Sequence, residues 1–165
     1  MQGFYDSYTF LAYGVDGVPN SGDEFVQVAS LSYGDGSVNN DGWDWESRLL
    51  SYYNKNYLPN TTFTASSGNG GWGFGTINSP QGDTTVSVGA SSKYGASTVF
   101  GSALTADQLL NGDVASFSGR GPDALGRPDP DVLATGAWGA GDTPLNAAVY
   151  DAYEVSWFVG DGNNA

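Results

Sequence analysis

The sequence predicts a loop-rich α/β or β-rich protein that contains a parallel pair of strands. The first observation is a strand, helix, strand order over residues 25–34, 42–53 and 61–67, since a helical crossover of that length joins parallel strands. The second is the composition: 25 Gly, 10 Tyr and 5 Trp, with many Ser, Thr and Asn, favour turns, short strands and surface loops over a helical bundle. A length of 165 residues is enough for an ordinary core.

The N-terminal third supplies the first elements. Residues 1–22 predict a short helix or strand followed by a loop, because turn signals stand at residues 16–17 and 19–22. The compact run 25–34 ends at Gly34 and predicts a buried strand that leads to a functional edge. Asp41 is the expected N-cap of the helix that follows. Its buried face is predicted from helical spacing to consist of Trp45, Leu49, Tyr52 and Tyr53.

Four further strands are expected after this helix. Residues 61–67 form the second strand, which runs into the glycine-rich segment 68–71. Residues 84–90, 114–118 and 131–134 predict three more. Beyond Gly136 the chain is rich in Gly, Asp and Asn with little periodicity, which is typical of loops. No internal repeat and no linker indicates a second domain.

The charge balance excludes several classes of partner. Eighteen acidic residues against five basic ones give a formal charge of −13, which repels phosphate backbones and anionic lipid headgroups. We therefore expect no nucleic-acid partner and no binding to a membrane surface. Membrane insertion is not expected either, because no apolar run approaches the ~20 residues of a span. The absence of cysteine excludes disulfides and thiolate metal sites.

Residue types also limit the chemistry. The sequence contains no histidine, so a Ser-His-Asp triad cannot be assembled from it. Lys55 and Lys93 stand in no motif that suggests an activated nucleophile. Carboxylate pairs are abundant and therefore uninformative. The pairs Asp44 with Glu46 and Asp129 with Asp131 are interpreted as supports of a helix start and of a turn.

Two motifs leave alternatives open. Asp35, Ser37, Asn39 and Asp41, with Glu46 following, partly match the alternating oxygen ligands of a calcium loop, but Asn40 stands where that loop has glycine. No cofactor is required, and a structural calcium ion remains an alternative. A sugar-stacking platform is the second alternative, formed by Trp43, Trp45, Tyr52, Tyr53 and Trp72. Helical spacing argues against it by assigning three of these rings to a buried face.

Three segments carry a resemblance to a known family. In order and spacing, residues 28–34 (VASLSYG), 65–71 (ASSGNGG) and 114–122 (VASFSGRGP) resemble three successive core motifs of the subtilisin-like (subtilase) peptidases. Residues 86–90 and 127–136 support the match, which is best over residues 25–136. Thr135 departs from the pattern, since the family usually has proline there. The resemblance implies a subtilisin-like three-layer α/β core with a mostly parallel sheet, incomplete in this chain.

The resemblance also implies a substrate cleft. Asn69 matches the side-chain amide donor of the family's oxyanion hole, and no metal ligand is implied. The two walls of the first specificity pocket are implied to be Ser32, Tyr33 and Gly34 on one side and Ser66, Ser67 and Gly68 on the other. An extended polypeptide substrate would lie between them, held by main-chain hydrogen bonds. Tyr33 is expected to narrow or cap a subsite.

In this family the catalytic Asp and His precede the first of these motifs, and the catalytic Ser follows the last. We therefore expect residues 1–165 to be a partial peptidase domain that lacks the triad segments, is inactive alone, and is unstable or bound to the remainder of the protease domain or to a partner chain. The parent is expected to be a serine endopeptidase, extracellular or at the cell surface. A catalytically dead peptide-binding or extracellular structural component is the alternative, and a carbohydrate-binding module is a third hypothesis.

Overall fold

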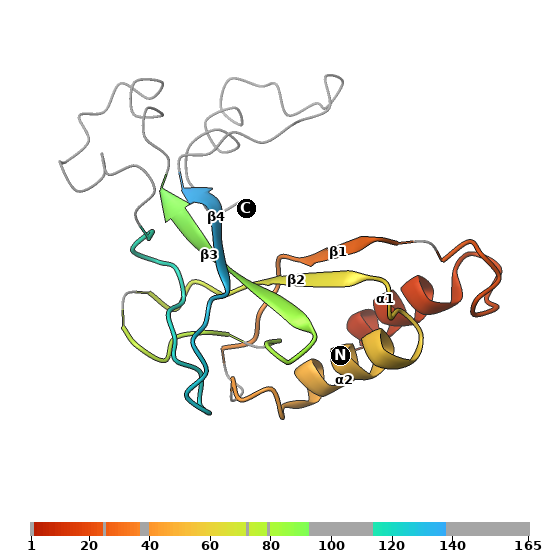
Figure 1. Ribbon diagram of the computed structural model, residues 1–165, viewed down its shortest axis with the longest axis horizontal. Helices are drawn as coiled ribbons and strands as arrows, with labels where there is room; N and C mark the ends of the chain where they lie inside the picture. The colour runs from red at the N-terminus through yellow and green to blue at the C-terminus, as the bar shows by residue number, and fades with distance from the viewer. Residues whose placement is uncertain are drawn as a thin grey trace, which may run out of the picture.

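A computed structural model describes residues 2–24, 26–36, 40–71, 73–78, 80–92 and 114–137 of the chain. Its elements are, in chain order, α1 (Gln2–Tyr13), β1 (Val28–Leu31), α2 (Trp45–Asn56), β2 (Thr62–Ser66), β3 (Thr85–Ser92) and β4 (Val132–Ala137). The strands form one sheet in the order β1-β2-β3-β4, and every neighbouring pair is parallel (Figure 1). The predicted α/β class with a parallel sheet is confirmed, including the α2 crossover from β1 to β2.

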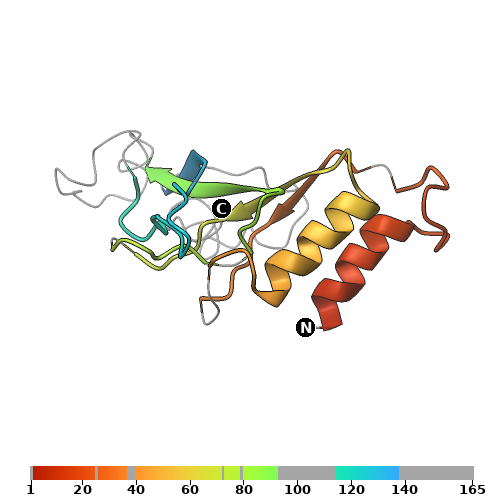
Figure 2. The same ribbon diagram turned by 60° about the horizontal axis from the view of Figure 1, so that its bottom comes forward.

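Both helices cover the same face of the sheet (Figure 2). Side chains alternate between the two faces of a strand, so Phe63 and Ala65 of β2 point to the helices and are buried. Tyr8 of α1 packs edge-on against Phe63, with 6.2 Å between the ring centroids. The core is completed by side chains of both helices and of the turn before β2, namely Ala12, Leu50, Tyr53 and Leu58.

The opposite face of the sheet is open in the described part of the chain. Val28 of β1 is 60 % exposed and Val132 of β4 is 49 % exposed. Thr62 and Ser30 are exposed as well. The described residues thus supply the sheet and one helix layer of the expected three-layer core.

The beginning of α2 corrects one prediction. Asp44, and not Asp41, caps the helix: its Oδ1 accepts from the backbone N of Ser47 at 2.9 Å, and its Oδ2 accepts from Ser47 Oγ at 2.7 Å. Asp41 instead accepts from the backbone N of Trp43 at 2.8 Å. The turn between them includes Gly42 at φ +75°, a backbone conformation outside the helical region.

The buried face of α2 also differs from the prediction. Leu50 is fully buried and Tyr53 nearly so, whereas Trp45 is 38 % and Tyr52 is 53 % exposed. The reason is the position of α1, which packs beside α2 and shares the sheet face with it. The interface therefore runs along Leu50 and Tyr53, and Leu49 is half-buried against the same core.

Two further predictions are refined by the structure. Residues 114–118 were predicted as a strand, but only Val114 pairs, through an isolated antiparallel bridge to Ser91, and a turn follows. The hydroxyl of Ser118 accepts from the backbone N of Ala90 at 3.0 Å. This N–H group of β3 therefore has a partner without a further strand. The N-terminal segment forms a helix, and Gly14 ends it at φ +62° with its N donating to the carbonyl of Phe10.

Candidate functional site

A cleft of about 740 Å³ lies over the open face of the sheet, at the carboxyl ends of the strands. Its lining consists of residues 30–34, 64–70, 88–90 and 134–136, together with Asn78 and Phe117. Ligands of open parallel sheets bind outside the carboxyl ends of the strands, so the location is typical of a binding site. All seven residues that the sequence assigned to the site line this cleft.

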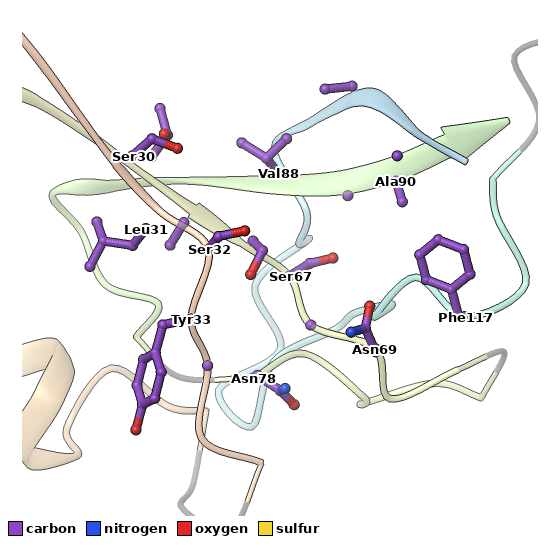
Figure 3. A pocket seen from close by; sticks show the side chains of 18 of the residues that line it. Ser30, Leu31, Ser32, Tyr33, Ser67, Asn69, Asn78, Val88, Ala90 and Phe117 are labelled. Atoms are coloured by element: carbon purple, nitrogen blue, oxygen red, sulfur yellow. The ribbon is translucent and has the colours of Figure 1, made fainter. Parts of the chain in front are cut away.

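The first wall continues from β1. Ser32 has the strand parity of Ser30 and belongs to the open face, whereas the Tyr33 ring is directed away from the cleft toward the helices (Figure 3). That ring lies 4.2 Å from the ring of Phe4, and the Tyr33 hydroxyl donates to Glu46 Oε1 at 3.0 Å. The expectation that the Tyr33 ring narrows or caps a subsite is therefore wrong in this structure. Strand alternation is the physical reason, and the backbone of Tyr33 forms the wall.

The titration of Tyr33 is consistent with its role as a donor. Burial and the hydrogen bond to Glu46 raise the pKa of the Tyr33 hydroxyl above its ordinary value. The hydroxyl is therefore protonated at neutral pH and donates a proton to the Glu46 carboxylate.

The second wall follows β2. The backbone N of Ser67 donates to the carbonyl of Val88 at 2.8 Å, and the Ser67 carbonyl accepts from the N of Asn78 at 3.0 Å. Ser67 is 1 % exposed, and its hydroxyl donates to the carbonyl of Gly119 at 3.3 Å. Ser67 therefore gives the wall its shape, because its main-chain and side-chain groups are bonded within the protein.

Asn69 lies at the end of this wall on a glycine-rich turn. It is exposed, and Figure 3 shows its side chain between Ser67 and Phe117 at the cleft. Gly68 before it adopts φ +88°, which favours glycine. Within the described residues its amide group has no hydrogen-bond partner in the protein. The side-chain N–H is therefore available to a bound group.

A second loop holds the Asn69 turn in place. The N of Gly119 donates to the carbonyl of Gly68 at 2.8 Å, and the N of Gly71 donates to the carbonyl of Phe117 at 2.9 Å. Thr76 Oγ1 accepts from the backbone N of Arg120 at 3.0 Å and donates to the carbonyl of Gly71 at 3.1 Å. These bonds join two of the sequence motifs into one rigid edge of the cleft.

Asn78 is a cleft residue that the sequence analysis missed. Its side chain fills the space beside Gly68 and Gly36: a Cβ at Gly68 would lie 2.3 Å from Asn78 Nδ2, and one at Gly36 would lie 3.1 Å from Asn78 Oδ1. The available signal was a pair of glycines in the two walls, which permits a side chain to enter between them. Their partner in space cannot be identified from the sequence.

The carboxylates outside the cleft have structural partners. Asp131 Oδ2 accepts from the backbone N of Ser87 at 2.8 Å. Burial, followed by the charges of Asp131 and Asp123, raises the pKa of Asp129. No cluster of three or more acidic side chains suited to a metal ion occurs among the residues that the structure describes. Ser37 and Asn39 of the calcium-type motif lie outside them.

Among the described rings, the structure removes one from the aromatic alternative and leaves Trp43, Trp45 and Tyr52 exposed. Trp43 is 70 % exposed with the Arg48 guanidinium 5.8 Å from its ring centroid, whereas Tyr53 is buried in the core. Trp72 and Lys93 lie outside the described residues, as does the segment after Ala137.

A comparison with protein families shows where these motifs belong. The subtilase family model matches residues 7–157, which is most of the chain. The chain belongs to the subtilase family. Among solved structures, a psychrophilic protease (22 % identity, TM-score 0.44) and sphericase (21 % identity, TM-score 0.45) are similar. A search of curated proteins gave no match.

The subtilase chain is short beside these two structures. Each similarity covers 67 % of this chain and 32 % of the solved one, so the chain spans about a third of their length.

Helices α1 and α2 have 12 residues each, and none of the described helices is long and apolar enough to cross a bilayer.

Proposed function

We propose that this subtilase chain forms the substrate cleft and one oxyanion donor of a serine endopeptidase. The observation that supports this most is the cleft itself: the Asn69 amide, which has no partner among the described residues, lies at its edge, on a turn fixed by hydrogen bonds to the loop after residue 116. The tetrahedral intermediate of acyl transfer concentrates charge on the former carbonyl oxygen, and a preorganised N–H stabilises that charge.

The substrate is an extended polypeptide. It lies between the main chain of residues 32–34 and the wall of residues 66–68, with hydrogen bonds to the first wall, because the pairing of β1 with β2 ends at Leu31 and the two walls continue beyond it. Ser32 and Gly34 contribute on one side, and Ser66, Ser67 and Gly68 shape the other. The reaction needs no cofactor, and a calcium ion at residues 35–46 would be structural.

The catalytic His comes from polypeptide outside this chain, because the sequence has no histidine. The order of the family's motifs supports the same proposal for the catalytic Asp and Ser. We infer that the isolated chain is inactive and that its open sheet face is covered by the remainder of the protease domain or by a partner chain. The complete protein works in an extracellular or cell-surface compartment, in keeping with the net charge of −13.

Kinetics of the complete protein test the proposal. The Asn69→Ala variant is expected to lower kcat strongly with little change in KM, because the donor acts mainly in the transition state. Asn60→Ala is the matched control: Asn60 is an exposed asparagine in the turn before β2, away from the cleft. Unchanged kcat in Asn69→Ala would overturn the oxyanion assignment. Binding of extended peptides without hydrolysis by the complete wild-type protein would favour the catalytically dead, peptide-binding alternative.

A further inference from the structure

One hydrogen bond joins the first wall of the cleft to the first turn of α2. The Tyr33 hydroxyl donates to Glu46 Oε1 at 3.0 Å, and the same ring lies 4.2 Å from Phe4 of α1. A residue of the cleft wall is thus attached to both helices on the far side of the sheet.

The acceptor end of this bond is buried, whereas Tyr33 as a whole is 37 % exposed. Glu46 is 4 % exposed, although it is a charged residue in the first turn of a helix. The space enclosed by Phe4, Tyr8, Tyr33, Trp45, Glu46 and Pro80 has no room for a water molecule. A buried carboxylate is costly unless it is hydrogen-bonded, and bonds to a charged acceptor are stronger than neutral ones.

The ladder between β1 and β2 ends before this wall begins. The pairing of β1 with β2 ends at Leu31 and Ala65, so residues 32–34 lie beyond the ladder. Alternation turns Tyr33 to the helix side and leaves its neighbours at the cleft. The Tyr33 side chain in this way links the wall to the packed helices.

We propose that Glu46 is a positioning residue, which holds the main chain of residues 32–34 through Tyr33 in the geometry that receives an extended peptide. The inference rests on the proposed function. A wall that is ordered before binding loses less conformational entropy when the peptide binds, so the bond supports affinity for the peptide and leaves the chemical step unchanged.

The test compares two substrates in the complete protein. One is a peptide long enough to lie along residues 32–34, and the other is a small ester that does not reach them. Tyr33→Phe removes one oxygen and is expected to raise KM for the long peptide roughly three- to tenfold, the range for one lost hydrogen bond. Its kcat for the long peptide and its KM for the ester are expected to change by a smaller factor than its KM for the long peptide.

Variants at position 46 complete a double-mutant cycle. Glu46→Leu is expected to raise KM for the long peptide as much as Tyr33→Phe does, and the double variant no further, because both remove the same bond. Glu46→Gln keeps an acceptor oxygen and is expected to stay within about twofold of wild type. Thermal unfolding of each variant checks that it is folded, and Tyr33→Phe decides the question if Glu46→Leu does not fold.

The opposite results are distinct. Additive effects, an equal rise in KM for the ester, or wild-type KM in Tyr33→Phe would overturn the positioning role while the proposed function stands. Failure of the wild-type protein to bind or cleave any peptide would overturn the proposed function, and this inference with it.

Discussion

The backbone N of Gly119 donates a hydrogen bond to the carbonyl of Gly68 across 2.8 Å. This bond joins the turn that carries Asn69 to the Ser-Phe-Ser-Gly segment far along the chain. The contact is close because neither residue has a side chain: a Cβ at Gly119 would lie 2.2 Å from the carbonyl oxygen of Ser67 and 3.0 Å from that of Thr76. The two loops can approach this closely only while position 119 is glycine.

Gly119→Ala is therefore expected to destabilise the protein by about 2 kcal/mol or more, since the obstructing atoms belong to the backbone and must move. Urea unfolding measures the change. Gly3→Ala is the control, because a Cβ at Gly3 of α1 meets nothing within 4 Å and alanine favours a helix. Equal stability of the two variants would show that the loops are less closely joined than described.

The buried side of α2 gives a second prediction. Leu50→Ala is expected to cost about 3 kcal/mol of unfolding free energy, because Leu50 is fully buried in the core cluster. Tyr52 is on the same helix but 53 % exposed, so Tyr52→Ala is expected to cost less than about 1 kcal/mol. Chemical denaturation measures the unfolding free energy of both variants. If the face predicted from the sequence were the buried one, Tyr52→Ala would cost more than Leu50→Ala.

The elements that local patterns determine were predicted well. Residues 25–34 predict the strand that forms as β1, and residues 61–67 predict β2, because β-branched and apolar residues bounded by glycine or proline favour a strand locally. The cleft residues Ser32 and Asn69 followed from the family resemblance. Both lie at the carboxyl ends of strands, where chain order alone brings them together.

The features that could not be predicted from the sequence depend on contacts between residues distant in the chain. Trp45 and Tyr52 have helical spacing suited to a buried face, but α1 determines which side of α2 meets the core. In the sequence Glu46 is a typical acidic residue of a helix's first turn, and only the structure shows its hydrogen bond from Tyr33. The segment at residue 114 has strand composition, yet the Ser118 hydroxyl takes the place of a ladder partner for Ala90.

The Asp123–Arg127 pair gives a pH dependence. Burial alone would raise the pKa of Asp123, but hydrogen bonds from the backbone and side chain of Arg127 and from the N of Leu125 lower it below its ordinary value. A carboxylate with a lowered folded-state pKa adds stability above its unfolded pKa of about 4, and this stability is lost as the pH falls through the folded-state value.

Asp123→Asn is expected to cost about 2 kcal/mol near pH 7, less than the roughly 3–5 kcal/mol of a fully buried pair, because the Arg127 side chain is 35 % exposed. Below the folded-state pKa of Asp123, most of this difference from wild type should disappear. Unfolding free energies at pH 7 and at several points below pH 4 test it. A constant difference at all pH values would contradict the charge-based explanation.

The most direct test of the central claim is the affinity of the complete protein for a peptide boronic acid, whose tetrahedral adduct places an oxygen where the oxyanion forms. Asn69→Ala is expected to weaken binding of this analogue roughly 10²-fold or more, a loss of the size that removal of one such donor causes in subtilisin itself. Affinity for the corresponding uncleaved peptide should change less than about threefold. Equal weakening of both ligands, or of neither, would contradict the account of Asn69 as the oxyanion donor of this cleft.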